Sequence, residues 1–228
     1  MRQLEEPGMA YVDFIGRVHN STKRDYLLRV IQHDKAECSK VAKQFGKDYW
    51  DGDRRYGYGG YNYDGRWRSV AENMVSHYGL NANARILDVG CGKGFLVYEF
   101  AQVIPQARVA GVDVSKYAIE NGKEEVRPFL QVGNAIDLPF EDNSFDLVVS
   151  INTLHNLYIF DLKKALQEIE RVGKQHKYLV VDSYRTEQEK ANLLYWQITC
   201  ECFYTPQEWE WFFKESGYTG DYSYVFYE

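Results

Sequence analysis

From Arg85 onward, short apolar runs alternate with stretches in which apolar residues recur at helical spacing. This pattern is typical of a parallel α/β sheet, because strands buried on both faces are joined by helices that cross the sheet. The predicted strands span residues 85–89, 108–113, 128–132, 145–150 and 178–182. The predicted helices span residues 95–102, 116–125 and 161–172, and a helix over 70–77 precedes the first strand.

The C-terminal part of the chain predicts one more helix and one more strand. Thr205 is placed as an N-cap, Pro206 as the first helical residue and Glu208 as the acid of a capping box, which predicts a helix over residues 206–216. The last apolar run, residues 222–227, predicts a terminal strand.

The first 68 residues are polar and aromatic, and they differ in texture from the rest of the chain. Two helices are predicted there, over residues 23–32 and 34–45, and Ser21 or Thr22 is the expected N-cap of the first. We therefore expect an N-terminal helical cap over residues 1–68 and an α/β core over residues 69–228, within one compact unit.

Residues 48–67 interleave glycines with aromatic rings. Glycine gives the backbone freedom and the rings give flat contact surfaces, so this segment could close as a lid over a ligand. The alternative is an ordinary loop whose tyrosines pack on the domain and keep their hydroxyls in water. The sequence leaves both interpretations open.

Composition excludes several classes of function. The chain has 228 residues, 45% apolar residues and a net charge of −6 at pH 7, enough apolar surface for a core without metal or disulfide staples. The acidic balance argues against a nucleic-acid partner. No apolar run is long enough to span a bilayer, and acids and a proline stand near the beginning, so we expect a cytoplasmic protein without a membrane partner.

The four cysteines do not have metal-ligand spacing, and we expect reduced thiols and no metal site. The sequence does not fix the oligomeric state, and a monomer or a homodimer is expected.

The most informative segment is residues 86–95, ILDVGCGKGF, in which a strand runs into Gly90, Gly92 and Gly94 and then into a helix. The glycines allow a sharp turn and a close approach to a ligand, while the start of the helix presents unpaired N–H groups. Asp113 ends the next strand, where a carboxylate can accept both hydroxyl hydrogens of a ribose. This order of elements indicates an adenosine-like ligand.

Two residues distinguish between possible nucleoside ligands. A dinucleotide fingerprint needs a small residue where this chain has Phe95, which disfavours NAD and FAD. Asp88 adds a carboxylate at the end of the strand; it would repel a pyrophosphate but attract an amine or a sulfonium. The charges therefore favour S-adenosylmethionine.

This segment resembles the first motif of class I S-adenosylmethionine-dependent methyltransferases. The resemblance continues through VDVS at 112–115, NAIDLPFEDNSFDLVVS at 134–150, SINTLHNL at 150–157 and the late stretch TPQEWEWFFKESGY. It implies a Rossmann-like, mostly parallel sheet of about seven strands with the methyl donor over the ends of the first strands. The family normally ends in a β-hairpin, so the sheet either lacks a strand or pairs one near residues 198–204.

The resemblance also assigns residues to the donor. It implies that Gly90, Gly92 and Gly94 flank the methionine part, that Asp88 reaches its ammonium group and that Asp113 holds the ribose.

On the adenine side, the resemblance implies that Val114 packs on the ring, that Asn134 stands where the family usually has Asp, and that Ala135 offers its N–H group. Asn134 can still accept a bond from the adenine amino group. Ser150, which begins the SINTLHNL motif, is a further cofactor-binding candidate.

Methyl transfer needs a well-placed nucleophile and the removal of its proton, so few catalytic residues are expected. His155 follows the fourth predicted strand and titrates near neutral pH, and it is the candidate base; the alternative is a capping or pocket-lining histidine. Arg66 and Tyr58 are candidates to clamp the methionine carboxylate. Asp182 and Tyr184 follow the fifth predicted strand and are candidates for contact with substrate.

The leading hypothesis is transfer of a methyl group from S-adenosylmethionine, with S-adenosylhomocysteine as product, to an oxygen or nitrogen of a small polar acceptor such as a sugar or a secondary metabolite. A nicotinamide-dependent oxidoreductase on a similar sheet is an alternative, and a non-catalytic partner subunit that keeps the fold is another.

Overall fold

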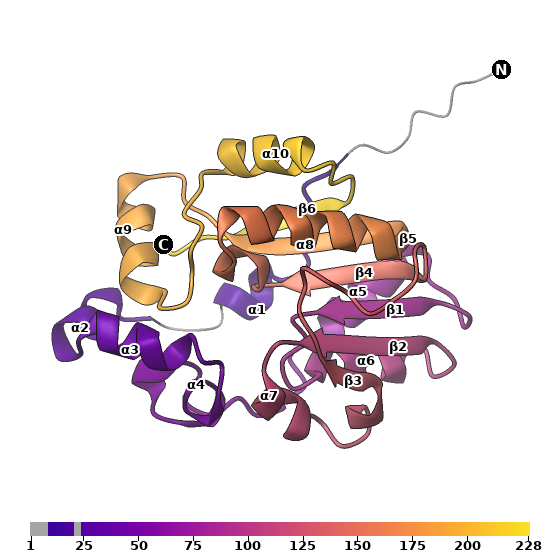
Figure 1. Ribbon diagram of the computed structural model, residues 1–228, viewed down its shortest axis with the longest axis horizontal. Helices are drawn as coiled ribbons and strands as arrows, with labels where there is room; N and C mark the ends of the chain where they lie inside the picture. Colours follow the sequence, from indigo (N-terminus) through magenta and orange to yellow (C-terminus); the bar gives the residue numbers. More distant parts are fainter. Residues whose placement is uncertain (1–8, 21–23) are drawn as a thin grey trace.

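The computed structural model describes residues 9–20 and 24–228. In these residues the chain forms one sheet of six strands in the order β3-β2-β1-β4-β5-β6, and every strand pair is parallel (Figure 1). The strands are β1 (Arg85–Val89), β2 (Arg108–Asp113), β3 (Leu130–Val132), β4 (Phe145–Ile151), β5 (Gly173–Asp182) and β6 (Asp221–Val225). The predicted Rossmann-like α/β class is confirmed.

Both faces of the sheet are buried, as the continuous apolar runs require. On β4, Val148 belongs to the hydrophobic cluster on one face, and Leu147 and Val149 belong to the cluster on the other. Helices α8 (Ile159–Val172) and α10 (Pro206–Glu215) cover the first face, and α5 (Arg68–Tyr78) and α6 (Phe95–Val103) cover the second. Figure 1 shows α8 in front of the sheet and α5 and α6 behind it.

The sheet has six strands in the described residues, where about seven were expected. Residues 198–204 form no strand and connect α9 (Glu187–Trp196) to α10 in an irregular path. Strand β6 pairs in parallel with β5, and on its other side Tyr11 forms a single parallel bridge with Tyr222. The terminal strand was thus predicted, but its hairpin partner is absent from the described sheet.

The N-terminal part contributes α1 (Gly16–Asn20), α2 (Tyr26–Gln32), α3 (Lys35–Ala42) and α4 (Lys47–Asp51). Helix α2 begins later than predicted because Asp25, whose side chain accepts the N–H of Leu28, is its N-cap. The expected caps Ser21 and Thr22 lie outside the described residues. Helix α3 ends at Ala42, earlier than the predicted 45.

Further elements differ from the sequence prediction, and β5 begins at Gly173, five residues before its predicted start. Helix α9, which packs against α2, was not predicted, and its weak separation of apolar and polar faces explains why. Helix α7 (Lys116–Glu120) stops before Gly122, and β3 begins only after a short 3₁₀ turn over Arg127–Phe129. The capping box of Thr205 and Glu208 at the start of α10 is confirmed.

In the part of the chain that the structure describes, no helix has the length and apolar character needed to cross a bilayer.

Helix α10 offers a matched test of the core. Trp209 is fully buried and its Nε1–H donates to the carbonyl oxygen of Asp182 at 3.0 Å, whereas Trp211 on the same helix is 61% exposed. We expect Trp209→Ala to lower the free energy of unfolding by about 3–5 kcal/mol, because a large cavity is left and an acceptor loses its donor. Trp211→Ala should change it by less than about 0.5 kcal/mol in the same urea titration. Equal losses in the two variants would contradict this packing.

Candidate active site

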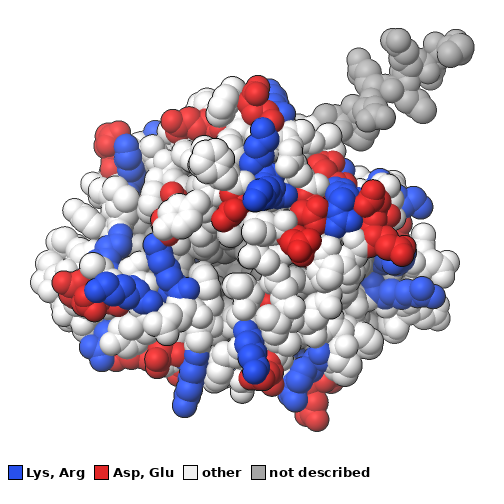
Figure 2. All heavy atoms as spheres, in the orientation of Figure 1, with Lys and Arg blue, Asp and Glu red and all other residues white. Residues whose placement is uncertain are grey.

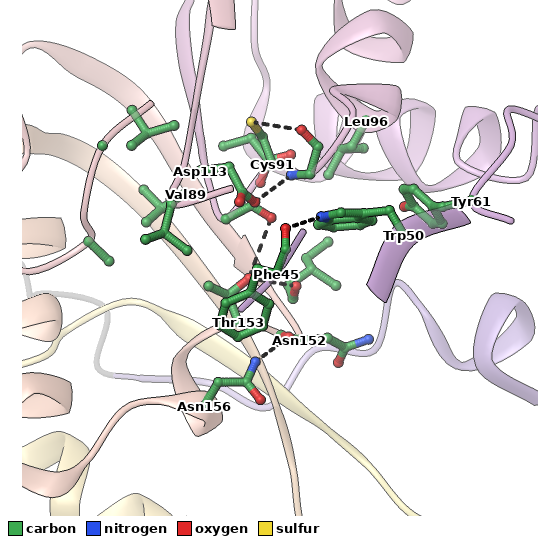
Figure 3. A pocket seen from close by; sticks show the side chains of 18 of the residues that line it. Phe45, Trp50, Tyr61, Val89, Cys91, Leu96, Asp113, Asn152, Thr153 and Asn156 are labelled. Atoms are coloured by element: carbon green, nitrogen blue, oxygen red, sulfur yellow. Dashed lines mark hydrogen bonds between the residues drawn. The ribbon is translucent and has the colours of Figure 1, made fainter. Parts of the chain in front are cut away.

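A cavity opens at the carboxyl ends of β1, β2 and β4, where parallel α/β sheets bind their ligands. The predicted site residues that line it are Tyr58, Asp88, Gly90, Gly92, Asp113, Val114, Asn134 and Ala135. Figure 3 shows Trp50, Tyr61 and Phe45 around the same space, with Asn152, Thr153 and Asn156 along one side. We call this space the first cavity.

The loop after β1 needs glycine for steric reasons. Gly90 has φ of +82°, and a Cβ atom there would lie 2.0 Å from Oγ1 of Thr153. Gly92 has φ of +53°, and a Cβ atom there would lie 2.8 Å from the Trp50 ring. Both positions therefore exclude other residues through backbone conformation and close packing.

Asp113 fixes this loop from the end of β2. Its Oδ2 accepts the N–H of Gly92 at 2.8 Å and its Oδ1 accepts the N–H of Ser115 at 2.7 Å. Burial raises the pKa of Asp113, although these two hydrogen bonds oppose the shift. The carboxylate thus holds the glycine loop and faces the first cavity, and it has lone pairs left for a ligand.

Asp88 is the unmatched acid of the site. It is 5% exposed, and within the described residues no hydrogen bond or ion pair reaches its carboxylate. Burial, and then the charge of Asp113, raises the pKa of Asp88 to about 8. A cationic group entering the first cavity would give this carboxyl the partner that residues 9–20 and 24–228 do not supply.

The adenine-side candidates lie at the open rim of the first cavity. Val114 is 57% exposed, and Ala135 and Asn134 follow β3. The Asn134 side chain accepts the N–H of Ile136 at 3.2 Å, so one lone pair of its oxygen is already used.

Two candidates support the loop from outside the cavity. Ser150 is buried and donates to the carbonyl oxygen of Val89 at 2.8 Å. Gly94 is the N-cap of α6, where a Cβ atom would lie 2.7 Å from Leu130. Neither residue is among those that line the first cavity.

The aromatic segment 48–67 covers the glycine loop. The Trp50 ring lies over Gly92, its Nε1–H donates to Ser115 at 2.9 Å, and it stacks on Tyr58 with ring centroids 5.2 Å apart. Tyr61 in turn stacks on Phe95 at 4.8 Å. The covered cavity measures about 150 Å³, below the roughly 300 Å³ usual for the pocket of a drug-sized ligand. A ligand of nucleoside size therefore requires this segment to shift.

One ion pair fastens the segment to the glycine loop. Lys93 lies between Gly92 and Gly94, and its Nζ is 2.7 Å from each carboxylate oxygen of Asp51 and 2.9 Å from the carbonyl oxygen of Tyr61. Burial raises the pKa of Asp51, but the hydrogen bonds from Lys93 and Tyr117 outweigh it, and the pKa is lowered. The carboxylate is therefore charged at neutral pH.

A second cavity adjoins the first, and we call it the second cavity. Both are lined by Tyr49, Tyr58, Tyr61, Trp67, Asn152 and Asn156. The second cavity is larger, about 340 Å³, and four arginines, Arg24, Arg29, Arg54 and Arg66, line it. Figure 2 shows the hollowed face of the molecule, with Lys and Arg side chains on the side of the hollow toward α2 and α3.

His155 lines the second cavity, but both of its ring nitrogens face Asp182. Nδ1 accepts the backbone N–H of Asp182 at 3.1 Å, and Nε2 lies 3.5 Å from Oδ2 of the same residue. Burial lowers the pKa of His155, and the Asp182 charge opposes the shift. The ring is therefore neutral, and it would have to leave one of these contacts to accept a proton from a substrate.

The structure separates the two residues proposed to clamp the methionine carboxylate. Tyr58 lines both cavities, whereas Arg66 lines only the second and binds Asp64, with Nη2 and Oδ2 2.6 Å apart. The guanidinium of Arg66 thus pairs with its own neighbour, and its role as a clamp stays a prediction. At the end of β5, Asp182 contacts His155, and Tyr184, two residues further on, is buried in the hydrophobic cluster on the second face of the sheet.

Sequence reasoning missed several residues that shape the site. The aromatic segment 48–67 contains Trp50 and Asp51, and the glycine loop contains Lys93. No sequence pattern predicts the ion pair between Asp51 and Lys93 that joins the two. Trp196 and Arg29 come from α9 and α2, and neither helix carries a motif. Among the described residues, no three His, Cys, Asp or Glu side chains form a group that could hold a metal ion.

Residues 80–217, more than half of the chain, match a protein family described as the methyltransferase domain. The chain belongs to this family, which confirms the resemblance seen in the sequence.

Curated relatives match the same region. A demethylmenaquinone methyltransferase of Symbiobacterium thermophilum is 38% identical over 118 residues, which cover 48% of this chain and 46% of the relative. A ubiquinone/menaquinone biosynthesis C-methyltransferase of Citrifermentans bemidjiense is 34% identical over 131 residues, 54% of each chain. This chain thus spans about half the length of the curated relatives it matches.

Solved structures agree with the fold. The YcgJ protein of Bacillus subtilis has a TM-score of 0.53 at 24% identity, covering 64% of this chain and 66% of its own. A complex of a Haloferax volcanii methyltransferase activator, Trm112, with a putative methyltransferase gives 0.51 at 22% identity, covering 66% and 72%. At these identities the similarity shows the fold alone.

The Lys93–Asp51 pair predicts a local opening. In Asp51→Asn, the Lys93 ammonium, whose side chain is 7% exposed, loses its counter-charge at a cost of about 3 kcal/mol. We expect amide hydrogen exchange in residues 47–67 to become about a hundredfold faster. The control is Asp53→Asn, which removes an exposed ion pair with Arg55 at 3.5 Å and keeps a residue able to cap the following turn. Unchanged exchange in Asp51→Asn would show that this pair does not fasten the segment.

Proposed function

We propose that this protein transfers the methyl group of S-adenosylmethionine to a small polar acceptor. The observation that carries the proposal is the unmatched carboxyl of Asp88, which faces the first cavity one strand away from Asp113. A ligand with a cationic amine or sulfonium at one end and ribose hydroxyls at the other has the groups that these two acids would bind. Membership of the methyltransferase-domain family supports the same donor.

When bound, the donor supplies a methyl group on a positively charged sulfur. The acceptor's lone pair forms the new bond to the methyl carbon, the carbon–sulfur bond breaks, and its electrons leave on a neutral thioether sulfur. The acceptor's proton passes to a base or to water. The protein's part is to hold both reactants in line and to exclude water, and the aromatic wall of Tyr58, Tyr61 and Trp67 is placed for both tasks.

The acceptor side favours a polar molecule. The second cavity is lined by arginines, asparagines and tyrosines. Two of the relatives, in contrast, have names that refer to demethylmenaquinone and to ubiquinone/menaquinone biosynthesis. A long apolar acceptor would leave these polar groups without partners. We therefore keep oxygen or nitrogen of a small hydrophilic molecule, such as a sugar or a secondary metabolite, as the proposed acceptor atom. The role of His155 as base stays a prediction.

The titration of Asp88 gives a signature of donor binding. Asp88 is protonated below about pH 8 in the free protein, and a cationic ligand lowers its pKa, so binding near pH 7 should release a proton. Affinity for S-adenosylmethionine should therefore rise, by up to about tenfold per pH unit, as the pH approaches 8. Calorimetry in two buffers of different ionisation enthalpy measures the released proton. Asp88→Asn should bind at least about tenfold more weakly and release none, whereas the exposed control Glu120→Gln should match the wild type. Equal heats in both buffers for the wild type would contradict the role of Asp88.

The activity itself is tested with the purified chain, labelled donor and a panel of small hydrophilic acceptors. We expect formation of S-adenosylhomocysteine together with a product heavier by one methylene unit, detected by mass spectrometry. NADH should not bind, because Phe95 and Tyr61 stack where a dinucleotide needs close helix packing. Binding of the donor without methylation of any acceptor would favour a non-catalytic partner subunit, and binding of NADH in its place would overturn the proposal.

A further inference from the structure

Three arginines surround one tryptophan in the second cavity. The Cζ atoms of Arg24, Arg29 and Arg54 lie 5.5, 4.7 and 5.1 Å from the centre of the Trp196 ring. Arg24 precedes the N-cap of α2, Arg29 lies within α2 and Arg54 begins the 3₁₀ turn over Arg54–Tyr56, while Trp196 ends α9. We call these four residues the arginine cluster.

Two of these guanidinium groups have only neutral partners. Arg29 donates to the carbonyl oxygen of Arg54 at 3.4 Å, and Arg54 donates to the carbonyl oxygen of Gly57. Among residues 9–20 and 24–228, no carboxylate forms an ion pair with Arg29 or Arg54. The buried Nε–H of Arg29 also has no hydrogen-bond partner. A partly buried N–H group without an acceptor destabilises the folded protein, because its desolvation is not compensated by a hydrogen bond. An anionic ligand that accepts from this group would remove that penalty.

The third guanidinium, that of Arg24, is oriented by a neutral histidine. Nδ1 of His19 lies 3.1 Å from Nη2 of Arg24, and Nε2 of His19 lies 3.0 Å from the carbonyl oxygen of Phe226. Burial, and then the Arg24 charge, lowers the pKa of His19, so the ring accepts from Arg24 and donates to Phe226. These two contacts orient the Arg24 guanidinium at the edge of the second cavity.

The charge of the second cavity is opposite to that of the chain. Four arginines line it, and Asp64, the one acidic lining residue in the described part of the chain, is bound to Arg66. The whole chain has a net charge of −6. Burial lowers the pKa of Arg29, and the nearby Arg54 charge adds to the shift. The arginines that line the second cavity therefore attract an anionic ligand.

We propose that the arginine cluster binds an anionic group, a carboxylate or a phosphate, of the methyl acceptor. The proposal rests on the proposed function and specifies its substrate class. The planar guanidinium groups suit carboxylate or phosphate oxygens, and their contacts with the Trp196 ring hold them near one another. The acceptor's nucleophile lies at the other end of the molecule, at the wall of Tyr58, Asn152 and Asn156 that the two cavities share. The anion itself is therefore not the methylated group.

The alternative occupant of the arginine cluster is the carboxylate of the donor's own methionine part. No residue of the cluster lines the first cavity, in which Asp88 and the glycine loop lie. The aromatic wall stands between the cluster and those residues. This placement favours the acceptor as the occupant. The two occupants can be distinguished because a substitution in the arginine cluster would weaken anion binding in one case and donor binding in the other.

The test uses the full chain, saturated with S-adenosylhomocysteine, and two anions as probes, inorganic phosphate and succinate, with succinamide as the uncharged comparison. Binding is measured by calorimetry at constant ionic strength. The variants are Arg29→Gln and Arg54→Gln, and the matched control is Arg55→Gln, because Arg55 neighbours Arg54 but pairs with Asp53 and does not line the second cavity. Affinity for S-adenosylmethionine is measured separately in every variant.

We expect saturable binding of phosphate or succinate, weakened at least about tenfold in Arg29→Gln and Arg54→Gln and unchanged in Arg55→Gln, with donor affinity unchanged throughout. Whichever probe binds more tightly identifies the anion as phosphate-like or carboxylate-like. Absence of saturable binding of either anion to the wild type, or binding of succinamide equal to that of succinate, would overturn the proposal.

Two further outcomes separate this proposal from the proposed function. If Arg29→Gln and Arg54→Gln weaken donor binding as much as anion binding, the anion is the donor's own carboxylate and the acceptor assignment is overturned. If the wild type binds the anion but not S-adenosylmethionine, the proposed function fails, and the acceptor role of the cluster fails with it.

Discussion

The carboxylate of Asp113 is the constraint on which the site depends. The N–H groups of Gly92 and Ser115 donate to its two oxygens, so one side chain holds the loop after β1 and the turn after β2 together. The parallel register of β1 and β2, in which Val89 pairs with Val112, places Asp88 beside it. The pKa of each acid is raised by burial, and that of Asp88 also by its neighbour, so a cationic group bound between them would stabilise both carboxylates.

The aromatic segment depends on the same loop. Lys93 is inside the glycine loop, and its ion pair with Asp51 joins the segment's first helix, α4, to the loop that Asp113 holds. Trp50 adds a hydrogen bond to Ser115, the other residue fixed by Asp113. Since lid and loop share these partners, a shift of the segment disturbs the loop as well. Of the two interpretations left open by the sequence, the structure therefore favours a cover fastened over the site.

The sequence predicted the parts of the fold that have a strong local signal. Strands β1 and β2 were placed with their observed bounds, and α10 was identified from its capping box. Helix α9 was missed because its apolar residues do not form a single face, and its place is fixed by tertiary packing against α2. In the site, Asp88, Gly90 and Asp113 were found because a motif orders them along the chain. For Arg66 the sequence could not show the pairing with Asp64 or the place in the second cavity, because both depend on how the segment folds.

The two cavities differ in charge, and the wall between them makes that difference possible. Acids face the first cavity and arginines face the second, separated by Tyr58, Tyr61 and Trp67. Without this wall, Asp88 and the arginines could pair with one another, and each cavity would lose its preference for a charged ligand. Aromatic rings are large, uncharged and rigid, so they keep the opposite charges apart. The two cavities still adjoin each other, so a donor in the first and an acceptor in the second can come into contact. The many tyrosines of residues 48–67 therefore separate the charges of the two cavities as well as covering the site.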